Sequence, residues 1–154
     1  MDHYEAKQRY GKIEVVESGE SVYFLAKSIL DQMTVYNRDL RSQMYSRLNR
    51  FSSDVHWTED VLPRTLDDYH LSIPKDCELE QAALLLQPHL TQKFRFRVNT
   101  EIWSSMNRLN QASLIAHEVL YSIAIDFSSE PFVFDASPVR YLVGLALGQR
   151  VQTE

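Results

Sequence analysis

The residues of this chain best suited to chemistry are His117, Glu118 and Tyr121, which form a His-Glu-x-x-Tyr pattern inside the apolar segment 114–125. In zinc peptidases the equivalent helix reads His-Glu-x-x-His. Its two histidines bind the metal from one helix face, and its glutamate is the general base. A tyrosine replaces the second histidine here. The pattern leaves three options open: a working metal site, a degenerate one, or a coincidence.

Helical geometry determines how these three side chains would lie. At about 100° per residue, His117 and Tyr121 fall one turn apart on the same side, and Glu118 lies about a quarter turn away. The opposite face is apolar and comprises Ile115, Ala116, Val119, Leu120 and Ile123. Because the polar trio has so many apolar neighbours, we expect it to be buried or to line a cleft.

Two interpretations follow for this trio. In the first, zinc or another divalent metal is bound by His117 and Tyr121, with Asp135 as a possible third ligand and Glu118 polarising a bound water. In the second, the trio is a structural cluster, because buried polar groups must be paired or hydrogen-bonded. Neutral tyrosine is a poor zinc ligand, which favours the structural cluster.

Arg140 is the candidate partner of Glu118 in that structural cluster. It lies in a helix that is apolar nearly all round, on the same side as Val143 and Leu147. We therefore expect Arg140 to be partly buried and to need an anion, which Glu118 or Asp135 could supply. We favour an ordinary helix-entry carboxylate as the role of Asp135.

The segment between these two helices is unusually rich in aromatic residues. It carries Phe127, Phe132 and Phe134 within a loop. Such a loop either docks onto the body of the protein or exposes a patch for a protein or peptide partner, and we favour docking.

The first half of the chain must supply the elements that position this cluster. Residues 1–19 form an N-terminal arm. Over 20–51 apolar residues recur every three or four positions, which predicts one long amphipathic helix. The region 54–98 is strand-rich. Alternation predicts short strands near 69–73 and, most clearly, at 94–98, and a strand is favoured over a helix at 78–87.

The region 99–150 contains the His-Glu-x-x-Tyr motif and three predicted helices. Asn99 or Thr100 caps a short helix, Asn110 caps the motif helix over 111–126, and Ser137-Pro138 begins a last helix to about residue 148. Together these elements predict a single α+β domain over 1–154. A small antiparallel sheet would pack against the long N-terminal helix, the motif helix and the C-terminal helix.

Composition excludes several classes of protein. A net charge of −5 argues against nucleic-acid binding, and we place the four arginines within 38–50 on the solvated side of a helix. The single cysteine, Cys77, rules out an intramolecular disulfide and a cysteine-based zinc cluster. No segment approaches the roughly 20 apolar residues of a membrane span. No signal pattern opens the sequence. The expected location is the cytoplasm, unless an upstream segment exists.

Several segments resemble a family of uncharacterised bacterial proteins, many with secretory leaders. Asp2-His3-Tyr4-Glu5-Ala6 is similar to a family DxYEA segment, and residues 73–81 are similar to an LPxGCxxEQ run. The most specific block runs from Phe96 through the motif to Asp135 and Val139-Arg140. The resemblance implies that the His-Glu-x-x-Tyr pattern is a family feature. It also implies an exported or periplasmic protein if an upstream segment is missing. It implies no activity. The order of strand, helix and His-Glu is also similar to that of zincin peptidases, by fold analogy alone.

Three functions remain open. The first is a degenerate zincin-like binding or structural module built on His117, Glu118, Tyr121 and Arg140. The second is a metal-dependent, peptidase-like hydrolase with Glu118 as its catalytic base. The third is an interaction protein that works through the aromatic loop 127–134.

Overall fold

The computed structural model describes residues 20–33, 38–64, 80–86, 94–127 and 136–150. The N-terminal arm, the strand expected at 69–73, Cys77, Phe132, Phe134 and Asp135 lie outside these ranges. The described elements follow the order α2 (Val22–Met33), α3 (Arg38–Asp54), β1 (Val55–Thr58), β2 (Ala83–Leu85), β3 (Phe96–Asn99), α4 (Thr100–Ser105), α5 (Arg108–Phe127) and α6 (Ser137–Arg150). Helices with one small sheet make this an α+β fold, as the sequence predicted.

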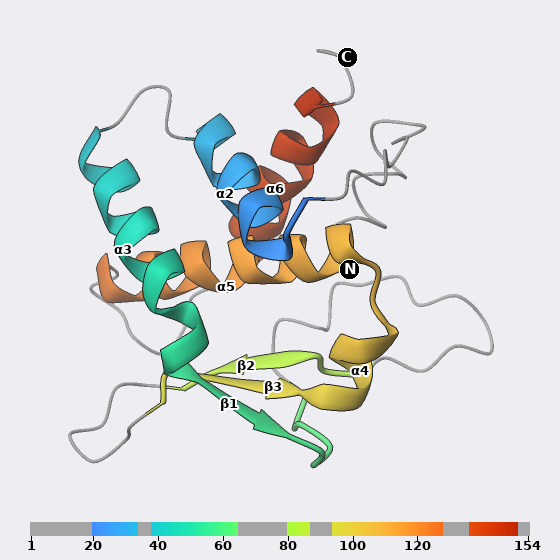
Figure 1. The fold of residues 1–154 in the computed structure, drawn as a ribbon. Helices are drawn as coiled ribbons and strands as arrows, with labels where there is room; N and C mark the ends of the chain where they lie inside the picture. Colours follow the sequence, from blue (N-terminus) through green and yellow to red (C-terminus); the bar gives the residue numbers. More distant parts are fainter. Residues whose placement is uncertain (1–19, 34–37, 65–79, 87–93, 128–135, 151–154) are drawn as a thin grey trace.

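Helix α5, which carries the His-Glu-x-x-Tyr motif, is the central element. Figure 1 shows α5 running across the middle of the molecule, with α2 and α6 on one side and the sheet on the other, while α3 passes across α5 to reach the sheet. The contacts agree, because α5 touches α2, α3, α6 and β2. A helix enclosed in this way must be apolar over most of its circumference, and ten of its residues are buried.

The sheet is mixed, and this corrects the expectation of an antiparallel sheet. Its strand order is β1-β3-β2, with β1 parallel and β2 antiparallel to the central strand β3. Phe96 of β3 is therefore opposite Val55 on one side and Leu85 on the other. Phe96 and Val98 are buried and Arg97 between them is half-buried, so the predicted alternation is confirmed.

Strand β1 lies at the start of the region 54–98 that the sequence marked as strand-rich, but no strand was predicted at 55–58. Four residues are too few to show an alternating pattern, although Val55, Trp57 and Thr58 are good strand formers. The strand follows α3 without an intervening loop, and the backbone N–H of Arg95 donates to the carbonyl of Asp54 at 2.8 Å. The preference for a strand within 78–87 is confirmed by β2.

The prediction of a single long helix over 20–51 was also wrong, since α2 and α3 are separate helices that contact each other. The apolar spacing continues through both, which is why periodicity alone joined them. Thr34, Val35 and Asn37, which lie between the two helices, are poor helix formers. Splitting the segment lets both helices pack against α5 (Figure 1).

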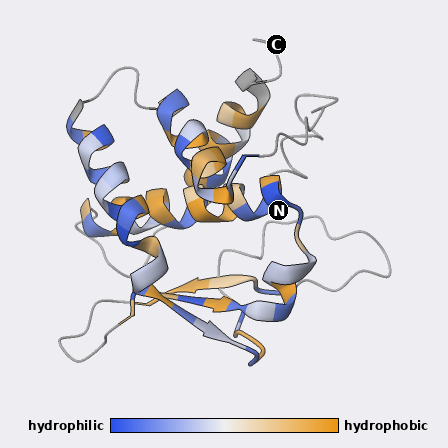
Figure 2. Cartoon of the chain, in the orientation of Figure 1, coloured by the Kyte–Doolittle hydropathy of each residue, from blue (hydrophilic) through white to orange (hydrophobic). Residues whose placement is uncertain are grey.

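One hydrophobic cluster holds the helices and the sheet together. Figure 2 shows hydrophobic residues gathered where α2, α5 and α6 meet. The rings of Phe51 and Phe96, both essentially inaccessible to solvent, lie 5.0 Å apart and join α3 to β3. The largest fully buried side chains are Phe51, Phe96, Ile29, Leu30, Met44, Ile115, Leu147, Val98, Val119 and Val143.

Asparagine caps begin the two helices that follow the sheet. The side chain of Asn99 accepts a hydrogen bond from the backbone N–H of Ile102 at 2.9 Å, which confirms Asn99 as the cap of α4. For α5 the cap is Asn107, whose Oδ1 accepts from the backbone N–H of Asn110 at 2.8 Å. The predicted cap, Asn110, lies inside the helix. Helix α6 begins at Ser137, as predicted.

Candidate functional site

The motif residues lie in the middle of α5, where neighbouring elements cover the helix from several sides. The apolar face predicted from the sequence is confirmed, because Ile115, Ala116, Val119, Leu120 and Ile123 are all buried. The polar side of the helix is also partly covered. His117 and Tyr121 are half-buried. The motif side chains are therefore not spread into bulk water.

His117 and Tyr121 stack along the helix, as residues four apart should. Their ring centroids are 5.9 Å apart, and the ring planes are inclined by 39°. Tyr121 packs against the hydrophobic core while remaining partly accessible. Both rings therefore lie next to each other and keep part of their surface accessible to solvent.

Glu118 is the most deeply buried of the three, with 5% of its surface exposed. Moving a carboxylate into the interior is costly unless cations or hydrogen-bond donors compensate its charge. The surroundings of α5 must supply that compensation. Because Glu118 points into the packed interior, it differs from the two half-buried rings beside it.

Arg140 is also buried, at 7% exposure, which agrees with the expectation from its apolar helix. It lies in the first turn of α6, and α6 packs against α5. Its Nη2 lies 3.5 Å from the hydroxyl of Ser137. A buried guanidinium and a buried carboxylate therefore occur on two helices that are in contact.

The remaining predicted site residues are placed differently. Phe127 ends α5 and is 71% exposed, whereas Phe132, Phe134 and Asp135 lie outside the described residues. Within the described part of the chain, no three histidine, cysteine, aspartate or glutamate side chains are grouped so that they could hold a metal ion.

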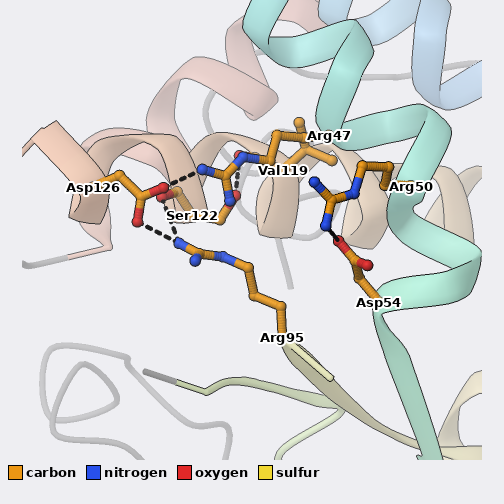
Figure 3. Close-up of polar contacts among 7 residues, drawn as sticks. All are labelled: Arg47, Arg50, Asp54, Arg95, Val119, Ser122 and Asp126. Carbon is orange, nitrogen blue, oxygen red and sulfur yellow. Dashed lines mark hydrogen bonds and ion pairs between the residues drawn. The ribbon is translucent and has the colours of Figure 1, made fainter. Parts of the chain in front are cut away.

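The sequence analysis missed a second polar cluster, centred on Asp126 in the last turn of α5. Figure 3 shows the Asp126 carboxylate between the guanidinium groups of Arg47 and Arg95. Arg47, from α3, binds Oδ2, and Arg95, just before β3, binds Oδ1. Arg95 Nη2 also donates to the carbonyl of Ser122 at 3.2 Å. One carboxylate thereby joins α3, α5 and the sheet.

This cluster corrects the interpretation of the arginines in 38–50. Arg41 and Arg50 have exposed side chains, but Arg47 is only 27% exposed because it binds Asp126. One signal in the sequence was available: Asp126 lies in the last turn of the helix, where the helix dipole disfavours negative charge. Such a residue requires a cation from elsewhere in the fold.

Comparison with family models, with curated proteins and with solved structures gave no match. Among the helices that the structure describes, none is both long and apolar enough to cross a membrane.

Proposed function

We propose that the protein is a degenerate zincin-like binding or structural module whose His117, Glu118, Tyr121 and Arg140 form a partly buried polar cluster. The observation that carries this proposal is the burial of Glu118 at 5% and of Arg140 at 7% on two helices in contact. A pair of opposite charges buried together satisfies both groups, whereas either group alone would be strongly destabilising.

Two further features support a structural role. A general base must reach a water molecule and a substrate, yet Glu118 is the least accessible of the three motif residues. The zincin-like part of the proposal depends on the order of elements, in which a mixed sheet is followed by a short helix and then by the motif helix.

The test compares the stabilities of Glu118→Gln, Arg140→Met and the double variant. Each single change should cost about 3 kcal/mol or more, because it strands a buried charge. The double variant should be clearly less destabilised than the sum of the two, since coupled residues are not additive. The exposed Glu59→Gln, outside the helices and strands, is the matched control and should stay within about 0.5 kcal/mol of wild type.

Urea unfolding followed by circular dichroism gives these free energies. Additive costs in the double variant would reject the pairing of Glu118 with Arg140. If Glu118→Gln and Arg140→Met both unfold at the wild-type midpoint, the cluster has no structural role and the proposal fails.

The second candidate is a metal-dependent hydrolase that binds zinc or another divalent metal. It is favoured by the partial accessibility of His117 and Tyr121, whose ring centroids are 5.9 Å apart. Elemental analysis of protein purified without chelator tests this candidate. Stoichiometric zinc that is lost in His117→Ala would support it, whereas protein that cannot be loaded with zinc would exclude it.

A further inference from the structure

The only two tryptophans of the chain, Trp57 and Trp103, meet at one end of the sheet. Trp57 lies on β1, and Trp103 lies on α4, which directly follows β3 (Figure 1). The ring centroids are 5.2 Å apart, with the planes inclined by 65°. We call Trp57, Trp103 and the nearby Val61, with the segments that carry them, the tryptophan corner.

Hydrogen bonds from side chains to backbone carbonyls fix the two segments of this corner against each other. The hydroxyl of Thr100 donates to the carbonyl of Thr58 at 3.3 Å, and the side-chain Nδ2 of Asn99 donates to the carbonyl of Asp60 at 3.1 Å. Residues 57–61 and 99–103 therefore form one local surface. Its geometry is set by the sheet and by the start of α4.

Two large apolar side chains of this surface are exposed to solvent. Trp57 is 40% exposed and Val61 is 91% exposed. Tryptophan is highly buried on average, and exposed tryptophans are enriched among the residues that dominate binding at protein interfaces. The exposed part of the Trp57 ring is therefore accessible to a partner.

The charges around the tryptophans indicate what kind of partner fits. Every ionisable side chain in the two segments is acidic: Glu59, Asp60 and Glu101. Asp60 is matched by Arg97, with 3.5 Å between Oδ2 and Nη2. Glu59 and Glu101 are exposed, and neither forms an ion pair within the described part of the chain. Indole faces attract cations, so the rings and the two carboxylates favour the same ligand charge.

We propose that the tryptophan corner docks a basic segment of a partner polypeptide. A lysine or arginine side chain of the partner lies against the indole rings, and Glu59 and Glu101 hold its charge. A second copy of this chain fits poorly, because each copy carries a net charge of −5 and like charges oppose association. This proposal is independent of the cluster around Glu118.

Intrinsic fluorescence reports on this surface alone, because both tryptophans lie in it. The probe is acetyl-tetra-arginine amide, titrated under selective tryptophan excitation, with acetyl-tetra-glutamate amide as the control peptide. The tetra-arginine peptide should change the emission saturably, and its affinity should fall as NaCl is added. The tetra-glutamate peptide should have no effect.

Amino-acid substitutions test whether the peptide that changes the tryptophan emission binds at the tryptophan corner. Glu59→Gln and Glu101→Gln should each weaken tetra-arginine binding about two- to fivefold, as expected for an exposed charge pair. Asp39→Asn removes one charge from the far end of α3 and should leave the affinity unchanged. Circular dichroism confirms that each variant is folded.

Three results would overturn the proposal. The first is an emission that does not respond to the tetra-arginine peptide. The second is equal binding by wild type and a folded Glu59→Gln/Glu101→Gln double variant. The third is an equal response to tetramethylammonium chloride at the same concentration, which would identify a small-cation site in place of a peptide surface.

Discussion

Arg95 immediately precedes β3 and binds the carboxylate of Asp126 in the last turn of α5, so a single ion pair joins the sheet to the central helix. Arg47 binds the other carboxylate oxygen from α3. The two guanidinium groups offset the unfavourable position of a carboxylate at a helix C-terminus. This contact unites three elements that sequence periodicity treats as independent.

Asp126→Asn should therefore destabilise the fold by about 1 kcal/mol, since the three side chains are only partly exposed but still reach solvent. The loss should be smaller at high salt, where the wild-type ion pairs are already screened. Urea unfolding at low and high NaCl measures both effects. Glu59→Gln, at an exposed position outside the helices and strands, is the control and should change stability little. A salt-independent loss in Asp126→Asn would argue against this ion-pair explanation.

Asn107→Ala should destabilise α5 by about 1 kcal/mol, because it removes the oxygen that accepts from the N–H of Asn110. Asn110→Ala, three residues further on, should cost less than Asn107→Ala, because the Asn110 Oδ1 is buried and accepts no hydrogen bond from the described residues. Thermal unfolding of the two variants decides between the two asparagines as the helix cap. A larger loss in Asn110→Ala would restore the assignment made from sequence.

Phe51→Ala should cost about 3–5 kcal/mol, because it removes a fully buried ring that packs on Phe96 between α3 and β3. Phe127→Ala makes the same chemical change at a site that is 71% exposed, and should be nearly neutral. Chemical denaturation of both variants measures the difference. Equal losses would contradict the burial of Phe51 in the core.

Asp31 should make the free energy of unfolding depend on pH. Burial raises the pKa of this carboxyl, but hydrogen bonds from Tyr45 and Lys27 and the charges of Lys27 and Arg41 outweigh burial, so its pKa lies below the ordinary value. A lowered pKa stabilises the fold above the unfolded pKa of about 3.9. That stabilisation is lost as the pH falls toward the folded pKa.

Unfolding free energies measured from neutral pH to below pH ~3.9 test this dependence. Tyr45→Phe should lose less stability on acidification than wild type, because it lacks the hydroxyl that donates to Asp31. Asp31→Asn should lack this component altogether. An identical acid response in all three proteins would show that Asp31 does not contribute.

The features of the fold that depend on residues close together in the sequence were predicted correctly. The alternation in β3, the Asn99 cap, the Ser137 start and the apolar face of α5 are all confirmed. The break between α2 and α3 was not predictable from periodicity, because both helices pack on the same core and so share one pattern. Strand β1 depends on its pairing with β3, which no window of four residues can reveal.

The contacts of the candidate site show the same difference between neighbouring and distant residues. The stacking of His117 on Tyr121 follows from their spacing on one helix. The contacts of Asp126 with Arg47 and Arg95 join residues far apart in the sequence, and only the folded arrangement brings them together. The pairing of Glu118 with Arg140 and the metal ligands remain predictions.

The sheet also has a consequence for the order of folding. Phe96 pairs with Leu85, which is near in the chain, and with Val55, which is much farther away. Closing the longer loop costs more conformational entropy, and a parallel pair cannot form from a tight hairpin. The β2–β3 pair should therefore gain protection from amide exchange before β1 joins it, and the edge strand that carries Trp57 should be the last part of the sheet to become native.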